Sequence, residues 1–425
     1  MQHEKPVCAG PLEGIRVLDL TSVVLGPLAT QSLADLGADV IKVEGPEGDL
    51  MRANGVSRNA GMSSIYLALN RNKRSVVLDL KTPAGAAALR RLIAGADVLI
   101  HNMRVAAIER LGFGYAAVAA LNPRIVYCVA TGFGQDGPHR DKPAFDDIIQ
   151  AACGLVALGA VAGGRPEYVP SLIADKTTGM ALANAVMAAL LHRERHGSGQ
   201  AVEVPMLETM ASFVMAEHLA GLTFEPATGP AGYARLLQGG RRPAQTADGW
   251  ICALPYTDRH WKAFFHAVGR DDLGDKYNIT SRAQRNAHIR ALYQHLAQIT
   301  PTRTTKAWMA LFETLDIPAT PIYAPDELLA HPHLEAVGLF QQTEHPTEGP
   351  LREMRPTARF SATPLSLRRH APSLGEHTDE VLREAGLAPE EIRARIREIR
   401  SLTDKPFGVD LLLPASMAEV VDTRA

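Results

Sequence analysis

One carboxylate, Asp175, stands between an apolar run and the small-residue turn Lys-Thr-Thr-Gly, at the start of a long Ala-rich stretch. The ordinary interpretation is a helix N-cap, because an aspartate there accepts backbone N–H groups and suits the positive end of the helix dipole. The alternative is a chemical role for the carboxylate. The rest of the chain has to decide between them.

Two further groups of residues invite a chemical interpretation. Asp146 and Asp147 are adjacent carboxylates, which repel each other, and both can simply cap the start of a helix. The histidines, with His331 and His333 as a pair, have no Cys or carboxylate partners at metal-ligand spacing. We therefore expect surface histidines and no metal site.

The bulk composition excludes several classes of protein. With 425 residues, 44 Lys and Arg against 46 Asp and Glu, and a formal net charge of −2, the chain shows no basic surface for nucleic acid or membrane. The four cysteines are far apart, which is typical of free thiols in a reducing compartment. The N-terminus has no apolar segment typical of a secretory signal. We expect a soluble, cytoplasmic protein.

Between residues 14 and 133, short apolar runs alternate with helix-like stretches. The strand candidates are residues 15–20, 39–44, 74–80, 97–102 and 124–133. Near-continuous apolar runs suit strands that are buried on both faces, and their alternation with helices predicts a doubly wound α/β fold with a mostly parallel sheet. No G-x-G-x-x-G fingerprint follows the first candidate, so a nucleotide bound as in NAD enzymes is not supported.

The composition changes after about residue 222. Residues 223–249 are rich in Gly, Pro and Arg, and helix-like stretches follow near 258–269, 287–299 and 303–317. Residues 339–346 and 351–361 again favour strands. We therefore expect a large domain formed by residues 8–222 and 335–390, a smaller α+β domain at 223–334, and an atypical tail at 391–425.

Six ordered motifs together resemble the class III CoA-transferase family, which includes the formyl-CoA, carnitine and succinyl-CoA-dependent transferases and the related α-methylacyl-CoA racemases. They are residues 11–52, 69–81, 122–138, 144–155, 191–208 and 374–382. The resemblance covers about residues 11 to 390. It implies a Rossmann-like large domain and two ring-like chains interlocked as a homodimer.

The resemblance puts the family's nucleophile on Asp175, which attacks the thioester of an acyl-CoA so that CoA passes to a free carboxylic acid. It implies acyl-CoA as a substrate and no tightly bound cofactor. It also implies a set of CoA contacts: Val24, Leu25, Leu78, Lys81, Asn102, Met103, Arg104, Arg110, Phe145 and Asp146. Core packing for the apolar members and solvated charges for the cations remain alternative interpretations.

Two departures from the family pattern bear on the reaction. Racemases of this superfamily carry His where this chain has Asp146, which argues against α-proton exchange. Residues 236–243 fall in the region of the mobile Gly-rich loop of the oxalate-specific members, but only Gly239 and Gly240 remain, so oxalate is not inferred as the acceptor. Arg241 and Arg242 either meet a dicarboxylate or are ordinary exposed loop residues. An acyl-CoA racemase or isomerase and a non-catalytic CoA-binding protein remain the alternatives. In the tail, residues 401–414 resemble a fragment of nitronate monooxygenases, from which no activity is expected.

Overall fold

The computed structural model describes residues 10–237, 240–388, 390–392, 394 and 397. Within these residues the chain forms two compact units. The first contains residues up to 153, residues 168–213, and residues from 338 onward, and the second contains residues 154–167 and 214–337. Residues 154–167, 214–222 and 335–337 fall in the second unit, although the sequence analysis places them in the large domain; the expected domain boundaries stay a prediction. The nitronate monooxygenase-like stretch lies outside the described residues.

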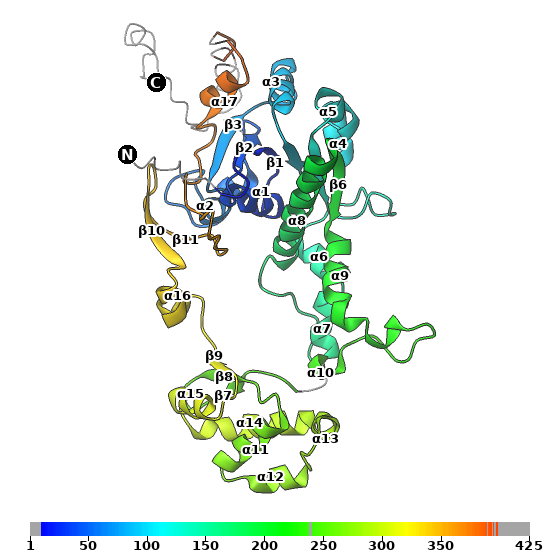
Figure 1. The fold of residues 1–425 in the computed structure, drawn as a ribbon, viewed down its shortest axis with the longest axis vertical. Helices are drawn as coiled ribbons and strands as arrows, with labels where there is room; N and C mark the ends of the chain where they lie inside the picture. Colours follow the sequence, from blue (N-terminus) through cyan, green and yellow to red (C-terminus); the bar gives the residue numbers. More distant parts are fainter. Residues whose placement is uncertain (1–9, 238–239, 389, 393, 395–396, 398–425) are drawn as a thin grey trace. The chain divides into compact units, whose positions relative to one another are not determined.

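A six-stranded parallel sheet forms the centre of the first unit (Figure 1). Its strands are β1 (Arg16–Leu20), β2 (Asp39–Glu44), β3 (Lys73–Val77), β4 (Val98–His101), β5 (Val126–Thr131) and β6 (Gln200–Pro205). They lie in the order β3-β2-β1-β4-β5-β6, with every neighbouring pair parallel. This is the strand order of the doubly wound dinucleotide-binding folds. The expected parallel α/β sheet is confirmed.

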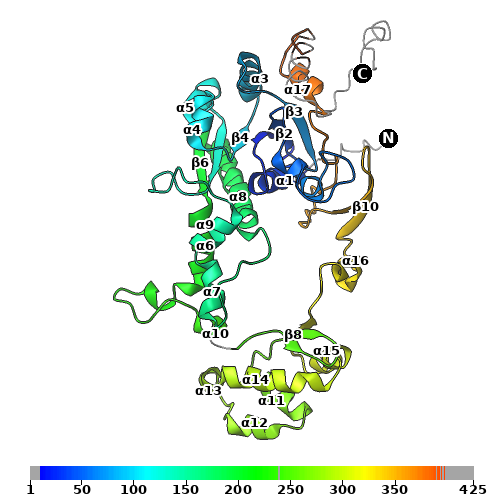
Figure 2. The ribbon, with the colours of Figure 1, turned by 180° about the vertical axis from the view of Figure 1, so that it is seen from behind.

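Helices cover both faces of this sheet, as the two opposite views show (Figures 1 and 2). One face carries α3 (Pro83–Ala94), α4 (Val105–Arg110), α5 (Tyr115–Leu121) and α17 (Thr378–Glu384). Leu89, Ile108 and Val381 from these helices pack in one buried cluster with Leu18 and Leu99 of the strands. The other face carries α1 (Leu25–Asp35) and α8 (Ile173–His196), which pack against each other and against the strands. Because both faces are covered, most residues of β1 to β5 are buried, the charged Asp19, Lys42 and Lys73 among them.

Local signals explain where several of these elements begin and end. Helix α3 has Pro83 at its first position, and the Thr82 hydroxyl accepts the N–H of Gly85 as an N-cap. Helix α8 ends at Gly197, whose φ of +80° is the left-handed conformation that glycine adopts readily at a helix C-terminus. The sequence analysis missed β6, because its alternating exposure at the edge of the sheet hides it among polar residues.

The remaining elements of the first unit frame the sheet. They are η1 (Leu50–Arg52), α2 (Ser64–Leu69), α6 (Asp146–Ala152), the start of α9 (Met206–His218), and the antiparallel hairpin of β10 (Phe340–His345) and β11 (Gly349–Met354). The hairpin agrees with the strands expected after residue 335.

Arg52 connects β2 to a segment near the C-terminal end of the described chain. Its guanidinium donates hydrogen bonds to the carbonyl of Pro372 and to both carboxylate oxygens of Glu44 in β2.

The second unit has its own small sheet and its own core. The antiparallel strands are β7 (Ala244–Gln245), β8 (Trp250–Ala253) and β9 (Ala319–Pro321). The α-helices are α7 (Leu155–Val161), α10 (Ala234–Leu237), α11 (Asp258–Ala267), α12 (Asp271–Lys276), α13 (Arg282–Ala287), α14 (Ile289–Ile299), α15 (Thr305–Thr314) and α16 (Pro332–Ala336), with 3-10 turns η2 (Ala220–Thr223), η3 (Thr300–Thr302) and η4 (Glu327–Ala330). Five fully buried aromatic side chains dominate its core: Trp261, Phe264, Phe265, Trp308 and Phe312.

A buried ion pair joins β1 and β3 of the large sheet. The Lys73 ammonium lies 3.1 Å from the Asp19 carboxylate, and both side chains are fully buried. Burial lowers the pKa of Lys73 to about 8, against the opposing attraction of Asp19. Although burial raises the pKa of Asp19, the ammonium groups of Lys73 and Lys42 lower it to about 2. Asp19 is therefore charged at neutral pH, and its countercharge is essential.

We predict that Lys73→Met lowers the free energy of unfolding by about 3–5 kcal/mol at pH 7, because the Asp19 charge is left buried without its nearest partner. Urea unfolding followed by circular dichroism measures this loss. Arg91→Met removes an exposed ion pair with Glu391 and is the matched control, with an expected change below about 1 kcal/mol. Equal effects of the two substitutions would show that the buried pair is not needed for stability.

Candidate active site

The carboxyl ends of β1 and β4 define the crevice where the strand order reverses. In open α/β sheets this switch point is where ligands bind. Here Ser22, which follows β1, and Asn102, which follows β4, form two reciprocal hydrogen bonds. The Ser22 N–H donates to Asn102 Oδ1 at 3.0 Å, and Asn102 Nδ2 donates to the Ser22 carbonyl at 2.9 Å. Asn102 therefore fixes the loop between β1 and α1.

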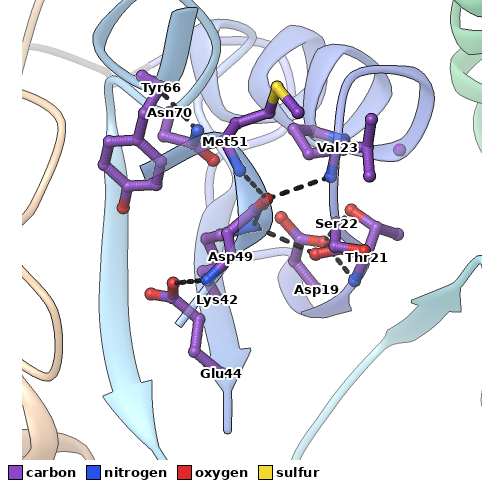
Figure 3. Close-up of polar contacts among 12 residues, drawn as sticks. Asp19, Thr21, Ser22, Val23, Lys42, Glu44, Asp49, Met51, Tyr66 and Asn70 are labelled. Atoms are coloured by element: carbon purple, nitrogen blue, oxygen red, sulfur yellow. Dashed lines mark hydrogen bonds and ion pairs between the residues drawn. The ribbon is translucent and has the colours of Figure 1, made fainter. Parts of the chain in front are cut away.

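Val23, in the same loop, has the left-handed backbone conformation. Its φ is +74°, which is rare for a β-branched residue and costs about 1–3 kcal/mol. The Val23 N–H donates to Asp49 Oδ1 at 3.0 Å, and the fully buried Lys42 ammonium donates to both Asp49 Oδ2 and the carbonyl of Thr21. Figure 3 shows Asp49 between the Lys42 ammonium and the amides of Val23 and Met51. This buried charge pair holds the strained loop.

Asp175 lies in the first turn of α8, which packs closely on the first turn of α1. A Cβ at Gly179 would lie 2.6 Å from the carbonyl oxygen of Leu25, so only glycine permits this approach. Leu172, at the N-cap position of α8, provides no side-chain hydrogen bond. Asp146 of α6 supplies one instead, because its Oδ1 accepts the N–H of Asp175 at 2.9 Å. The structure therefore brings Asp146 and Asp175 together.

Asp175 lines a cavity of about 320 Å³ in the first unit, together with several predicted residues. The predicted residues that line it are Leu25, Asn102, Met103, Arg104 and Phe145. Two further cations, Arg140 and Lys142, also line it. With three cations and the single carboxylate of Asp175 around it, the cavity is suited to anionic ligands.

The Asp175 side chain is poorly solvated, with the residue 9% exposed. Burial, with the neighbouring Asp146 carboxylate, raises the pKa of Asp175 to about 7. Its carboxylate accepts no hydrogen bond from the described residues, so none of them holds it as a helix cap. A carboxylate that is basic, desolvated and directed at a cavity is suited to nucleophilic or general-base chemistry.

The loop after β5 forms another wall of this cavity, and two glutamates that the sequence analysis missed hold it. Glu208 accepts the N–H of Gly134 at 2.9 Å, and Glu203 accepts the N–H of Gln135 at 3.0 Å and the Thr131 hydroxyl at 3.0 Å. Glu203 belongs to β6 and Glu208 to α9, both far from the loop in sequence. The loop continues to Arg140 and Lys142.

A second cavity of about 340 Å³ lies at the carboxyl ends of β1, β2 and β3. Leu78, Lys81 and Met103 line it, and it shares Met103 and Ser22 with the Asp175 cavity, so the two are adjacent. Together they provide an extended path for a long ligand. That these residues contact CoA stays a prediction.

Three predicted residues lie outside the walls of both cavities. Val24 is buried at the start of α1, where it acts as core, and Asp146 acts through its bond to Asp175. Arg110 is exposed at the end of α4. Arg241 and Arg242 belong to the second unit.

The sequence analysis missed Arg140 and Lys142, which line the Asp175 cavity. Their position just before the predicted Phe145 was the available signal.

Comparison with known proteins gives the family. The model of CoA-transferase family III matches residues 12–378, and the chain belongs to this family. It is 34% identical to a succinate–glutarate CoA-transferase of Agrobacterium fabrum, over 90% of this chain and 97% of that protein. It is 31% identical to a formyl-CoA:oxalate CoA-transferase of Afipia carboxidovorans, over 95% of this chain and all of that protein.

The comparison with solved structures supports the same fold. A CaiB/BaiF family protein from Brucella suis matches with a TM-score of 0.77 and 29% identity, covering 89% of this chain and 100% of that chain. The family resemblance and the expected enzyme class are confirmed. In the described part of the chain, no helix has the length and apolar character needed to cross a bilayer.

The raised pKa of Asp175 predicts a stability that depends on pH. The folded state keeps a proton that the unfolded state releases between about pH 4 and pH 7, so the free energy of unfolding falls across this window and the full penalty is present above pH 7. We expect Asp175→Asn to be more stable than the wild type by about 2–4 kcal/mol at pH 8, with little difference at pH 4.

Denaturant unfolding at both pH values measures this difference. Asp147→Asn, at the exposed neighbour of Asp146, is the matched control and should show no such pH dependence. A gain that is equal at pH 4 and pH 8 would contradict the assignment of a strained, desolvated carboxylate.

Proposed function

We propose that this family III CoA-transferase moves CoA from an acyl-CoA to a free carboxylic acid, with Asp175 as the covalent nucleophile. The observation that carries the proposal is the position of Asp175: a buried, basic carboxylate in the first turn of α8, facing a cavity lined by three cations. Family membership supports CoA transfer.

The proposed reaction conserves the activation of the acyl group through every step. The Asp175 carboxylate attacks the thioester carbon, the C–S bond breaks, and a mixed anhydride and CoA thiolate result. The thiolate attacks the aspartyl carbonyl, which releases the donor acid and leaves an aspartyl-CoA thioester. An acceptor carboxylate then attacks this thioester, which gives a second mixed anhydride and CoA thiolate. The thiolate attacks the acceptor's carbonyl carbon in this anhydride, which forms the new acyl-CoA and releases the Asp175 carboxylate. No ATP is required, and Asp175 is regenerated.

The charges around Asp175 suit this sequence. Each acyl transfer places negative charge on an oxygen, and the positive end of the α8 dipole and the cations Arg104, Arg140 and Lys142 stabilise it. The same cations serve the phosphates of CoA and the carboxylates of the donor and acceptor acids. The poor solvation of Asp175 removes the water shell that would weaken its nucleophilicity.

For the acids, we propose small dicarboxylates, with succinyl-CoA as a donor. The support is the similarity to the succinate–glutarate CoA-transferase and to a human succinyl-CoA:glutarate CoA-transferase, the latter 32% identical over 88% of this chain and 86% of that protein. A dicarboxylate carries a second anionic group, and a cavity with an excess of cations suits it.

The geometry does not favour the racemase alternative. Racemisation requires two bases on opposite sides of the α-carbon. Both oxygens of Asp146 are already occupied, Oδ1 by the N–H of Asp175 and Oδ2 by Gln150 Nε2 at 2.6 Å. Asp146 is therefore a structural acceptor in this arrangement. The alternative of a non-catalytic CoA-binding protein does not explain why a desolvated carboxylate with a raised pKa lies at the cavity.

The test is the intact mass of the protein after incubation with succinyl-CoA, where we expect a CoA adduct on Asp175 in the wild type. A second sample is treated with borohydride or hydroxylamine, which convert the aspartyl thioester to an alcohol or a hydroxamate and release CoA, so that the modified residue can be located. Asp175→Ala should form no CoA adduct and should lose at least about 10³-fold of the turnover. Asp147→Asn, one exposed carboxylate beside the site, should retain both. A wild type without an adduct that exchanges the α-proton of an acyl-CoA for deuterium would overturn the proposal in favour of racemisation.

We also propose that the enzyme is a homodimer. Helix α8 carries an exposed row of side chains at helical spacing, in which Met180, Ala188 and Leu191 are apolar and Asn184 is the single polar member. Light scattering after size exclusion should give twice the chain mass of 45.8 kDa. Met180→Glu with Leu191→Glu should shift the species toward the monomer; an unchanged mass would exclude this face as the interface.

A further inference from the structure

Gln150 is fully buried in α6 and has every polar atom engaged. Its Nε2 donates to Asp146 Oδ2 at 2.6 Å and to the carbonyls of Val169 and Ser171 at 3.3 and 3.2 Å. Its Oε1 accepts the N–H of Val169 at 2.9 Å. The side chain thus joins α6 to the segment that leads directly into α8. No part of the proposed reaction uses it.

The bond from Gln150 fixes which way the Asp146 carboxylate faces. With Oδ2 held by Gln150, Oδ1 is directed at the N–H of Asp175 and supplies the cap that Leu172 does not. An N-cap acceptor stabilises the start of a helix, because it satisfies a backbone N–H that has no partner within the helix. The consequence is that the position of the first turn of α8, and of Asp175 within it, depends on the Gln150 side chain.

We propose that Gln150 is a positioning residue for the reaction: it holds Asp146 against the N–H of Asp175, and so sets both the orientation of the nucleophile and the charge beside it. The inference rests on the proposed role of Asp175. The effect of Gln150 on the charge beside Asp175 follows from electrostatics. Burial is the larger cause of the raised pKa of Asp175, and the Asp146 carboxylate is the second cause.

Among the described residues that line the Asp175 cavity, the other charged groups are cations. Arg104 comes from the start of α4, and Arg140 and Lys142 come from the loop after β5. They line the same cavity, but burial and the Asp146 carboxylate are the causes of the raised pKa of Asp175. Asp146 from α6 is the opposing charge, so a change in its orientation or its charge lowers the pKa of the nucleophile.

The test substitution is Gln150→Met, which keeps the length of the side chain and removes every hydrogen bond. Without Gln150, Asp146 either turns from Asp175 or takes a proton, and both remove negative charge beside the nucleophile. We expect the pH midpoint for CoA-adduct formation to fall by about one unit, and its rate at pH 8 to fall by about 10- to 100-fold.

Gln31→Met is the matched control. Gln31 is also buried, and it bridges α1 to residues 68–71 with one donated and one accepted hydrogen bond, so its loss has a similar structural cost away from α8. We expect this variant to keep the wild-type pH midpoint. If Gln150→Met and Gln31→Met lose rate equally with no shift of the midpoint, Gln150 has only a structural role and the inference is wrong.

A second variant and a direct titration keep the test decisive if Gln150→Met does not fold. Asp146→Asn retains an oxygen acceptor for Asp175 and removes the charge, and should lower the midpoint by a similar amount. Carbon-13 NMR of the aspartate carboxyls, with Asp175→Asn to assign the signal, titrates Asp175 without any turnover. A wild type without an adduct would refute the proposed function, whereas an unshifted Asp175 titration in both variants would refute this inference alone.

Discussion

The fully buried pair of Lys42 and Asp49 is the interaction on which the ligand-binding end of the sheet depends. One ammonium group binds the Asp49 carboxylate and the carbonyl of Thr21, and the other oxygen of Asp49 accepts the N–H of Val23 in its strained conformation. Two buried charges are costly to desolvate, and they are tolerable because each has a close partner and further hydrogen bonds. The loop after β1 thereby takes a shape that its own residues do not favour.

Asp175, the proposed nucleophile, has the opposite environment for a buried charge. Lys42 and Asp49 are paired at 2.8 Å, whereas Asp175 has no partner for its carboxylate among the described residues and a like charge nearby. The paired charges stabilise the fold, whereas the unpaired carboxylate costs stability, which suits the reactivity that we propose for it. Both kinds of site lie in the first unit, so the strain at Asp175 is supported by the sheet and by the close packing of α8 on α1.

Much of this fold was predictable from the sequence, for physical reasons that can be named. β1 to β5 are short apolar runs between helix-like stretches, and burial on both faces makes that pattern unmistakable. β6 escaped because it lies at the edge and alternates in exposure. The assignment of residues 154–167 to the second unit was not predictable, since no change of composition marks where the chain passes from one unit to the other.

The candidate site was also predictable only in part. Asp175, Asn102 and Phe145 were predicted from the family resemblance, and the structure places all three at one cavity. Glu203 and Glu208 could not be found, because their partners Gln135 and Gly134 lie about 70 positions away and only the parallel pairing of β5 and β6 makes them neighbours. Lys42 and Lys73 resemble surface lysines until the strand register shows that they are buried.

The bonds between Gln150 and Val169 close a loop in the chain whose middle, residues 154–167, belongs to the second unit. The two ends of that excursion meet at the residues that lead into α8. The hydrogen bonds of Gln150 therefore hold together two points of the chain that are 19 positions apart. Breaking them would release this closed loop, and the gain in chain entropy opposes them. The start of α8 thus keeps its place against the entropy of the loop that precedes it.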